Sequence, residues 1–166
     1  MGVRMKILIA DDDRVTRELL GRTLKSAGYE VSFAEDGLDA VERASTEKPE
    51  VVLMDGLMPR MHGFVACKTI KELEDPPKVV LLTGIYTKAT YKWEAKGTYL
   101  ADGFLSKPFD KDVLLALIER LLLDLDRERS FTSLAMLAAL PCPPENPSPD
   151  SEMTCDLQVR SSEPAR

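Results

Sequence analysis

Acidic side chains, a hydroxyl and an amine each follow a short apolar segment of this 166-residue chain. The run Asp11–Asp13 follows the first such segment, and Asp55 follows the third. Thr83 comes after the fourth segment, and Lys107 directly follows the fifth. If these segments are parallel strands, their carboxyl ends meet at the edge where open α/β sheets bind ligands. We therefore expect the acids, the hydroxyl and the amine to lie together.

Such a cluster favours a hard divalent cation and phosphoryl chemistry. Carboxylates on neighbouring strands would repel each other by about 4 kcal/mol at a separation of about 4 Å and an effective dielectric constant of about 20. A site with few carboxylates, completed by water and phosphate, suits Mg²⁺. A carboxylate beside Mg²⁺ can attack a phosphoryl group and hold it as an acyl phosphate. The ammonium of Lys107 and the hydroxyl of Thr83 could then each contact a phosphoryl oxygen.

The segments that position these residues alternate in the manner of βα units, which predicts an α/β fold with a parallel sheet. Three of the five apolar segments are continuous aliphatic runs, as is typical of strands that helices cover on both faces. The expected strands are Lys6–Ala10, Glu30–Ala34, Val51–Met54, Val79–Leu82 and Gly103–Ser106.

Apolar residues at helical spacing predict five helices between and after the strands. The first ends at Gly28, the third ends before Pro76, and the fourth, around Thr90–Leu100, has Gly97 in its interior. The fifth begins after Asp110, which can cap it. Its apolar stripe consists of Leu114, Leu117, Ile118, Leu121, Leu122 and Leu125.

The composition changes after about residue 125. We expect residues 1–125 to form one domain and residues 126–166 to form a C-terminal extension. Residues 131–140 could form a short apolar helix within this extension. Six of the eleven prolines lie in the last 26 residues, which begin at Pro141. Because a segment so rich in proline joins a core poorly, we expect a disordered tail there.

Charge and cysteine content limit the partners and the compartment. A net charge of −6 argues against a general nucleic-acid or membrane surface. Cys67, Cys142 and Cys155 have no paired or metal-ligand spacing, which favours a reduced, cytoplasmic chain. The only histidine, His62, is expected in a turn, because one imidazole cannot make a histidine-based metal site. No apolar stretch approaches the ~20 residues of a membrane helix.

Four segments together resemble the receiver domains of two-component response regulators. They occur in the order of that family over roughly residues 5–125, and they are Ile7–Asp12, Val51–Pro59, Leu81–Gly84 and Phe104–Phe109. The resemblance implies a flavodoxin-like (βα)5 fold, a doubly wound parallel sheet with strand order 2-1-3-4-5. It also implies a cis peptide bond before Pro108.

The resemblance also implies a role for each residue of the cluster. Asp55 would be the phosphoacceptor, and Thr83 and Lys107 would complete the catalytic set. Thr83 and Phe104 would form the switch. The ligands of Mg²⁺ would be Asp11 through water, Asp12, Asp55 and the main-chain carbonyl of Leu57.

A single-domain receiver would accept its phosphoryl group from a histidine kinase or a phosphotransfer protein. It would be a signalling domain rather than an enzyme, although it would assist its own phosphorylation and slow dephosphorylation. Its output would be protein–protein contact through the fourth helix, fifth strand and fifth helix, and a phosphorylation-dependent homodimer stays open. Contact with DNA is not expected, because the 41 residues after Leu125 are acidic on balance and rich in proline.

Two other functions fit parts of the sequence. The run Asp11–Val15 also fits the opening motif of haloacid-dehalogenase-like phosphatases. That family needs an acidic Mg²⁺ motif after its lysine, whereas a leucine-rich helix follows Lys107, and Asp55 stays unexplained. The second alternative is a receiver-like interaction module that works without phosphorylation. Such modules commonly lose an acid, the threonine or the lysine, and this chain keeps all of them.

Some positions depart from the commonest pattern of the family. His62 stands where an acid is frequent, and the segment 86–99 is unusually aromatic and rich in lysine. Leu57 and Ile85 flank the expected path of the hydrolytic water and cannot orient it by hydrogen bonds. We therefore expect a long-lived phosphorylated state, although both side chains could simply be packing at the rim.

Overall fold

The computed structural model describes residues 5–84 and 100–138, with the backbone alone for residues 131–138. Five parallel strands form one sheet in the order β2-β1-β3-β4-β5, which confirms the flavodoxin-like order. The strands are β1 (Lys6–Ala10), β2 (Glu30–Ala34), β3 (Val51–Asp55), β4 (Lys78–Thr83) and β5 (Gly103–Ser106), and the helices are α1 (Arg14–Ser26), α2 (Gly37–Glu47), α3 (Gly63–Lys71) and α5 (Lys111–Ala138).

Some of the expectations lie outside the described residues. They concern almost all of the expected fourth helix, Ile85, the aromatic segment 86–99 and the proline-rich tail with its two cysteines. Among the described helices, none combines the length and the apolar character needed to cross a bilayer.

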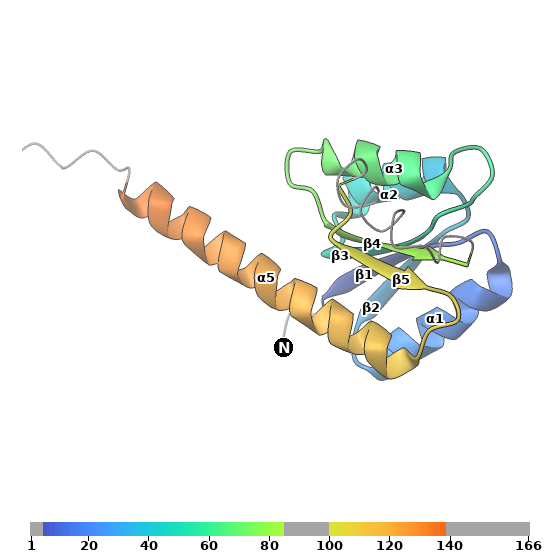
Figure 1. Cartoon of the computed structure of the whole chain (residues 1–166). Helices are drawn as coiled ribbons and strands as arrows, with labels where there is room; N and C mark the ends of the chain where they lie inside the picture. The colour runs from blue at the N-terminus through green and yellow to red at the C-terminus, as the bar shows by residue number, and fades with distance from the viewer. Residues whose placement is uncertain (1–4, 85–99, 139–166) are drawn as a thin grey trace, which may run out of the picture.

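Helices cover both faces of the sheet, with α2 and α3 on one side and α1 and α5 on the other (Figure 1). Successive side chains of a strand point to opposite faces. In β3, Val52 and Met54 therefore join the core under α2 and α3, whereas Val51 and Leu53 join the core under α1 and α5. All four are fully buried. This double burial is the physical reason for the continuous aliphatic runs in the sequence.

Aspartates cap the first two helices, α1 and α2. The side chain of Asp13 accepts hydrogen bonds from the backbone N–H groups of Val15 and Thr16, at 3.2 and 3.1 Å, and caps α1. Gly28, at a φ of 94°, follows the end of the same helix, as expected. The third aspartate of the run Asp11–Asp13 is thus explained by local structure, which leaves two for the site.

Residues 131–138 are helical, but they do not form a short helix of their own, because they are the last residues of α5, which is continuous from Lys111 to Ala138. Its side chains are buried against the sheet as far as Leu125, and the helix then runs on past the sheet (Figure 1). The 28 residues contain neither glycine nor proline, so nothing in the sequence ends the helix near residue 126. The change of composition marks the end of burial, not the end of the helix.

Candidate functional site

The carboxyl ends of four neighbouring strands bring the expected residues together. Asp11 directly follows β1, Asp55 ends β3, Thr83 ends β4, and Lys107 directly follows β5. Lys107 Nζ lies 2.7 Å from Asp11 Oδ2 and 2.6 Å from Asp55 Oδ1. Its backbone N–H donates to the carbonyl of Thr83 at 2.8 Å. One ammonium therefore bridges two carboxylates from two adjacent strands.

Burial and the ion pairs shift the pKa values of this cluster in opposite directions. The side chains of Asp11 and Asp55 are 1% and 13% exposed, and that of Lys107 is 28% exposed. Burial raises the pKa of Asp11 above its ordinary value, although the hydrogen bond from Lys107 works in the other direction. Burial alone would lower the pKa of Lys107, but its hydrogen bonds to Asp11 and Asp55 bring that pKa above its ordinary value. The amine therefore stays charged throughout the neutral pH range.

Thr83 and Phe104 lie on adjacent strands. Thr83 is 2% exposed and pairs in register with Ser106 of β5. Phe104 is partly buried and packs against the core under α2 and α3. The switch role that the resemblance implies for both residues stays a prediction.

Two backbone N–H groups close the loop after Asp55, one by a bond to a side chain and one by a bond to a carbonyl. The N–H of Leu57 donates to Asp55 Oδ2 at 2.8 Å, and the N–H of Gly63 donates to the carbonyl of Gly56 at 3.1 Å. His62 precedes α3 in an extended conformation, and its side chain makes no capping bond. Together with Lys107, the Leu57 N–H fixes the orientation of the Asp55 carboxylate.

The donor set of this edge fits Mg²⁺. Carboxylates and a main-chain carbonyl are the hard oxygen ligands that Mg²⁺ prefers. Asp11 and Asp55 converge on one ammonium, and Asp12 is exposed beside them. Within residues 5–84 and 100–138, no group of three or more His, Cys, Asp or Glu side chains is placed to hold a metal. An ion at this edge would therefore keep water or phosphate among its ligands, as Mg²⁺ commonly does.

Arg17 also contacts this site, and it was not among the site residues expected from the sequence. Its side chain is 11% exposed and donates to the carbonyls of Asp11 and Asp12, at 2.6 and 3.3 Å. The helical spacing could have revealed Arg17, because this residue lies on the same buried face of α1 as Leu20 and Leu24. A charged residue on a buried helix face needs a partner, because burying an unpaired charge is costly.

Residues 7–119 match the family model of the response regulator receiver domain, and the chain belongs to this family. Receiver domains are signalling modules of two-component systems, and this membership argues against the phosphatase alternative.

Relatives and solved structures agree with this assignment. The chain is 34% identical to "Response regulator MprA" of Mycobacterium avium (strain 104) over 133 residues, 80% of this chain and 57% of the relative. Its identity to the same-named protein of Mycobacterium leprae (strain TN) is 35%, over the same shares. The chain thus spans just over half the length of these curated relatives. Among solved structures, chemotaxis response regulator CheY4 of Vibrio cholerae has a TM-score of 0.65 at 30% identity, covering 72% of this chain and 99% of CheY4. The signal receiver domain of a histidine kinase from Syntrophus aciditrophicus has a TM-score of 0.67 at 30% identity. The match covers 74% of this chain and 93% of that domain.

We expect Lys107→Met to lower the free energy of unfolding at pH 7 by about 2 kcal/mol. The loss should stay below the ~3–5 kcal/mol of a fully buried pair because the lysine is partly exposed. The pKa of Lys107 is raised in the folded protein, so its stabilising contribution is present below the ordinary value of 10.5 and is lost as the pH rises through the raised value. Urea unfolding of both proteins at a series of pH values measures the difference, which should shrink in alkali.

The matched control is Lys111→Met, an exposed lysine at the start of α5. It should change the free energy of unfolding by less than about 0.5 kcal/mol. Equal effects of the two substitutions would contradict a specific role for the bridging ammonium.

Proposed function

We propose that Asp55 accepts a phosphoryl group from a histidine kinase or a phosphotransfer protein, and that the domain then signals by protein–protein contact. The observation that carries the proposal is the ammonium of Lys107, which lies 2.6 Å from Asp55 and 2.7 Å from Asp11. A carboxylate held beside a second carboxylate and a permanent cation at a strand end is suited to receive a phosphoryl group and to retain it.

In this mechanism, a carboxylate oxygen of Asp55 attacks phosphorus while the bond from phosphorus to the donor breaks. The N–H of Leu57 holds the second oxygen of Asp55 and so orients the nucleophile. Lys107 and the hydroxyl of Thr83 would then contact the new phosphoryl oxygens. Mg²⁺, held by Asp11 through water and by Asp12, Asp55 and the carbonyl of Leu57, would supply neutralisation of the transferring charge when bound.

The partners and the location belong to the same proposal. We infer a cytoplasmic protein whose receiver unit comprises residues 1–125 and whose output face would be built from the expected fourth helix, β5 and α5. A phosphorylation-dependent homodimer also stays open. The absence of DNA binding stays a prediction to which the comparisons lend no support, because the matched relatives extend well beyond the aligned region.

Phosphoryl transfer from acetyl phosphate tests the proposal. With Mg²⁺, the full chain should gain one acid-stable, base-labile phosphoryl group, and intact-mass and peptide analysis should place it on Asp55. A chain that binds Mg²⁺ but never gains phosphate would overturn the proposal and favour an interaction module that works without phosphorylation.

We also expect the phosphorylated state to be long-lived, because the side chain of Leu57 cannot orient a hydrolytic water. This side chain is 36% exposed at the rim, two residues beyond Asp55. Leu57→Asn should raise the first-order rate of phosphate loss by about threefold or more. The measurement is phosphate release after removal of acetyl phosphate. A rate equal to that of wild type, with normal labelling, would mean that Leu57 only packs at the rim.

A further inference from the structure

Two consecutive acidic residues just before α2, Glu35 and Asp36, contact two arginines, one from α1 and one from the loop after β3. Glu35 Oε1 accepts a hydrogen bond from an Nη of Arg17 at 2.9 Å. Asp36 Oδ2 accepts one from Arg60 Nε at 2.7 Å. Arg17 contacts the loop after β1, and Arg60 lies in the loop after β3. Asp11 and Asp12 lie in the first of these loops, and Asp55 directly precedes the second.

Arg17 holds the first loop by its backbone. One Nη donates to the carbonyls of Asp11 and Asp12, while the other reaches Glu35. Only a planar guanidinium offers several N–H donors in fixed directions, so a lysine cannot replace it. Because its side chain is 11% exposed, Arg17 is held in this place by packing as well as by charge. The backbone direction at Asp11 and Asp12 thus depends on the contact between α1 and α2.

Arg60 holds the second loop. Its φ of 61° is unusual for a residue with a side chain, and such a conformation costs about 1 kcal/mol. Asp36, which is 3% exposed, also caps α2 by accepting from the N–H groups of Leu38 and Asp39. Burial opposes its ionisation, but these hydrogen bonds and the Arg60 guanidinium keep the pKa of Asp36 below its ordinary value. The left-handed turn is therefore fixed to the start of α2 by a charged pair.

A second contact ties this loop to α2. A Cβ added at Gly37 would overlap the carbonyl oxygen of Met61 and lie 2.9 Å from its carbonyl carbon. The first residue of α2 therefore touches the backbone of the loop that follows Asp55. This contact and the Arg60–Asp36 pair are neighbours in the chain.

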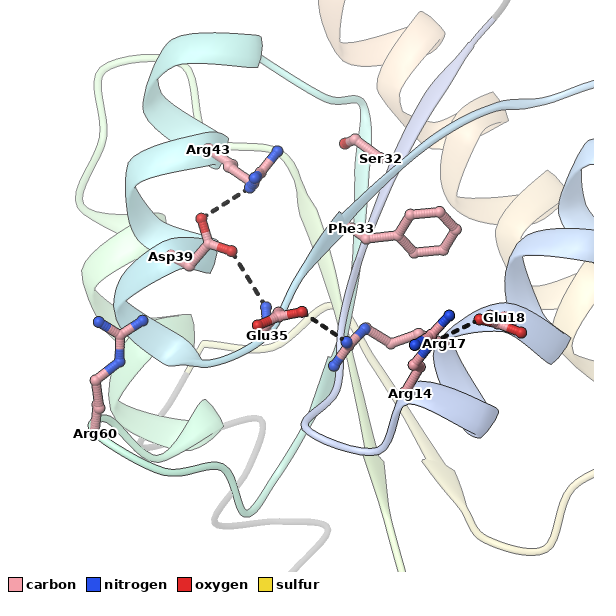
Figure 2. Close-up of a pocket in the computed structure, with 9 residues that line it drawn as sticks. All are labelled: Arg14, Arg17, Glu18, Ser32, Phe33, Glu35, Asp39, Arg43 and Arg60. Atoms are coloured by element: carbon pink, nitrogen blue, oxygen red, sulfur yellow. Dashed lines mark hydrogen bonds and ion pairs between the residues drawn. The ribbon is translucent and has the colours of Figure 1, made fainter.

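A groove of about 650 Å³ lies between α1 and α2, over β2 (Figure 2). Figure 2 shows a chain of bonds across it, from Arg43 to Asp39, from Asp39 to the N–H of Glu35, and from Glu35 to Arg17. The four arginines of the groove are Arg14, Arg17, Arg43 and Arg60, and each has a carboxylate partner. Carboxylates of the protein itself therefore neutralise these positive charges, which argues against an anion-binding pocket. The pairs Arg17–Glu35 and Arg60–Asp36 instead form a clamp on the two loops.

We propose that Arg17 and Arg60 are positioning residues for the divalent cation of the candidate site. Through Glu35 and Asp36 they fix both loops to one end of α2, so that Asp11, Asp12 and the carbonyl of Leu57 converge. The inference rests on the proposed function only in that it assigns Mg²⁺ to this edge. According to this proposal, α2 contributes no ligand itself, but its start determines the geometry of the ligands.

Mg²⁺ titration of the full chain by calorimetry tests the clamp, with Arg17→Gln and Arg60→Gln. Removing a positive charge near the carboxylates should by Coulomb's law alone strengthen binding of a cation. A positioning role predicts the opposite sign, and we expect the Kd for Mg²⁺ to rise about tenfold in each variant. The matched control is Arg14→Gln, whose partner Glu18 lies within the same helix. Its Kd should stay within about twofold of wild type or fall slightly.

Hydrogen exchange of the metal-free chain gives an independent measurement. The N–H of Asp13, which donates to Asp11 at 2.9 Å, should exchange faster in Arg17→Gln. The N–H of Leu57 should exchange faster in Arg60→Gln, and the amides inside β1 and β3 should not change. If the wild type binds Mg²⁺ but is not phosphorylated, the proposed function fails and the clamp is still judged by the Kd ratios. If it binds no Mg²⁺, the proposal is overturned as well, whatever the exchange rates are.

If Arg17→Gln does not fold, Arg60→Gln still tests the proposal. The Arg60 side chain is 62% exposed, so its substitution should leave the fold intact. Folded variants with a Kd within twofold of wild type and unchanged exchange at these amides would overturn the proposal. The same increase of Kd in Arg14→Gln would show a general effect of charge and would overturn it as well.

Discussion

Asp55→Asn is expected to lower phosphate incorporation from acetyl phosphate by about 1000-fold or more, because a neutral amide lacks the nucleophilic oxygen of a carboxylate. The neighbouring acid cannot take its place. Asp11 is 1% exposed and is held by Lys107 and by the N–H of Asp13. The measurement is intact-protein mass after incubation with acetyl phosphate and Mg²⁺.

Two controls separate loss of the acceptor from loss of the fold. Asp55→Asn removes one of two carboxylates that contact the same ammonium, so the free energy of unfolding should change by no more than about 1 kcal/mol. Asp75→Asn, at an exposed position after α3, should be labelled like the wild type. Undiminished labelling of Asp55→Asn would place the acceptor elsewhere and remove the basis of the proposed mechanism.

The sheet could be predicted from the sequence because its signal is strong and local. Strands β1, β2 and β5 have the expected bounds, and β3 and β4 are longer by one and two residues. A parallel strand buried on both faces leaves an uninterrupted aliphatic run, as in Val51–Leu53, and few other structures do so. Once the strand ends are known, the meeting of Asp11, Asp55 and Lys107 follows from the topology alone.

The clamp on α2 could not be predicted, because it depends on how elements approach one another. Arg17 and Glu35 are 18 residues apart, and Arg60 and Asp36 are 24 apart. No periodicity connects such pairs, and charged residues on helix surfaces are common. The end of α5 was missed for another reason. The change of composition after about residue 125 suggested a boundary, whereas a helix without glycine or proline continues for as long as its backbone hydrogen bonds can form.

Gly63 is the first residue of α3, and its substitution by alanine is expected to cost about 3 kcal/mol of the free energy of unfolding. A Cβ at this position would overlap the carbonyl oxygen of Asp55 and lie 2.9 Å from its carbonyl carbon and 3.0 Å from Met54 Cγ. The first two are backbone atoms at the end of β3, which cannot move without disturbing the pairing with β4. The clash should therefore outweigh the ~1 kcal/mol by which alanine normally favours a helix over glycine.

Urea denaturation measures this loss, and Gly84→Ala is the matched control. The nearest atom to a Cβ at Gly84 is Lys107 Cβ, at 4.0 Å, so this variant should keep the stability of the wild type within about 0.5 kcal/mol. Because the obstacle at Gly63 is the main chain of Asp55, relief of the clash must move the proposed phosphoacceptor or the start of α3. Labelling at Asp55 should therefore slow in Gly63→Ala even under conditions where the variant is fully folded. A variant as stable as wild type and labelled at the same rate would mean that α3 can withdraw from β3 at no cost, and that its close approach does not position Asp55.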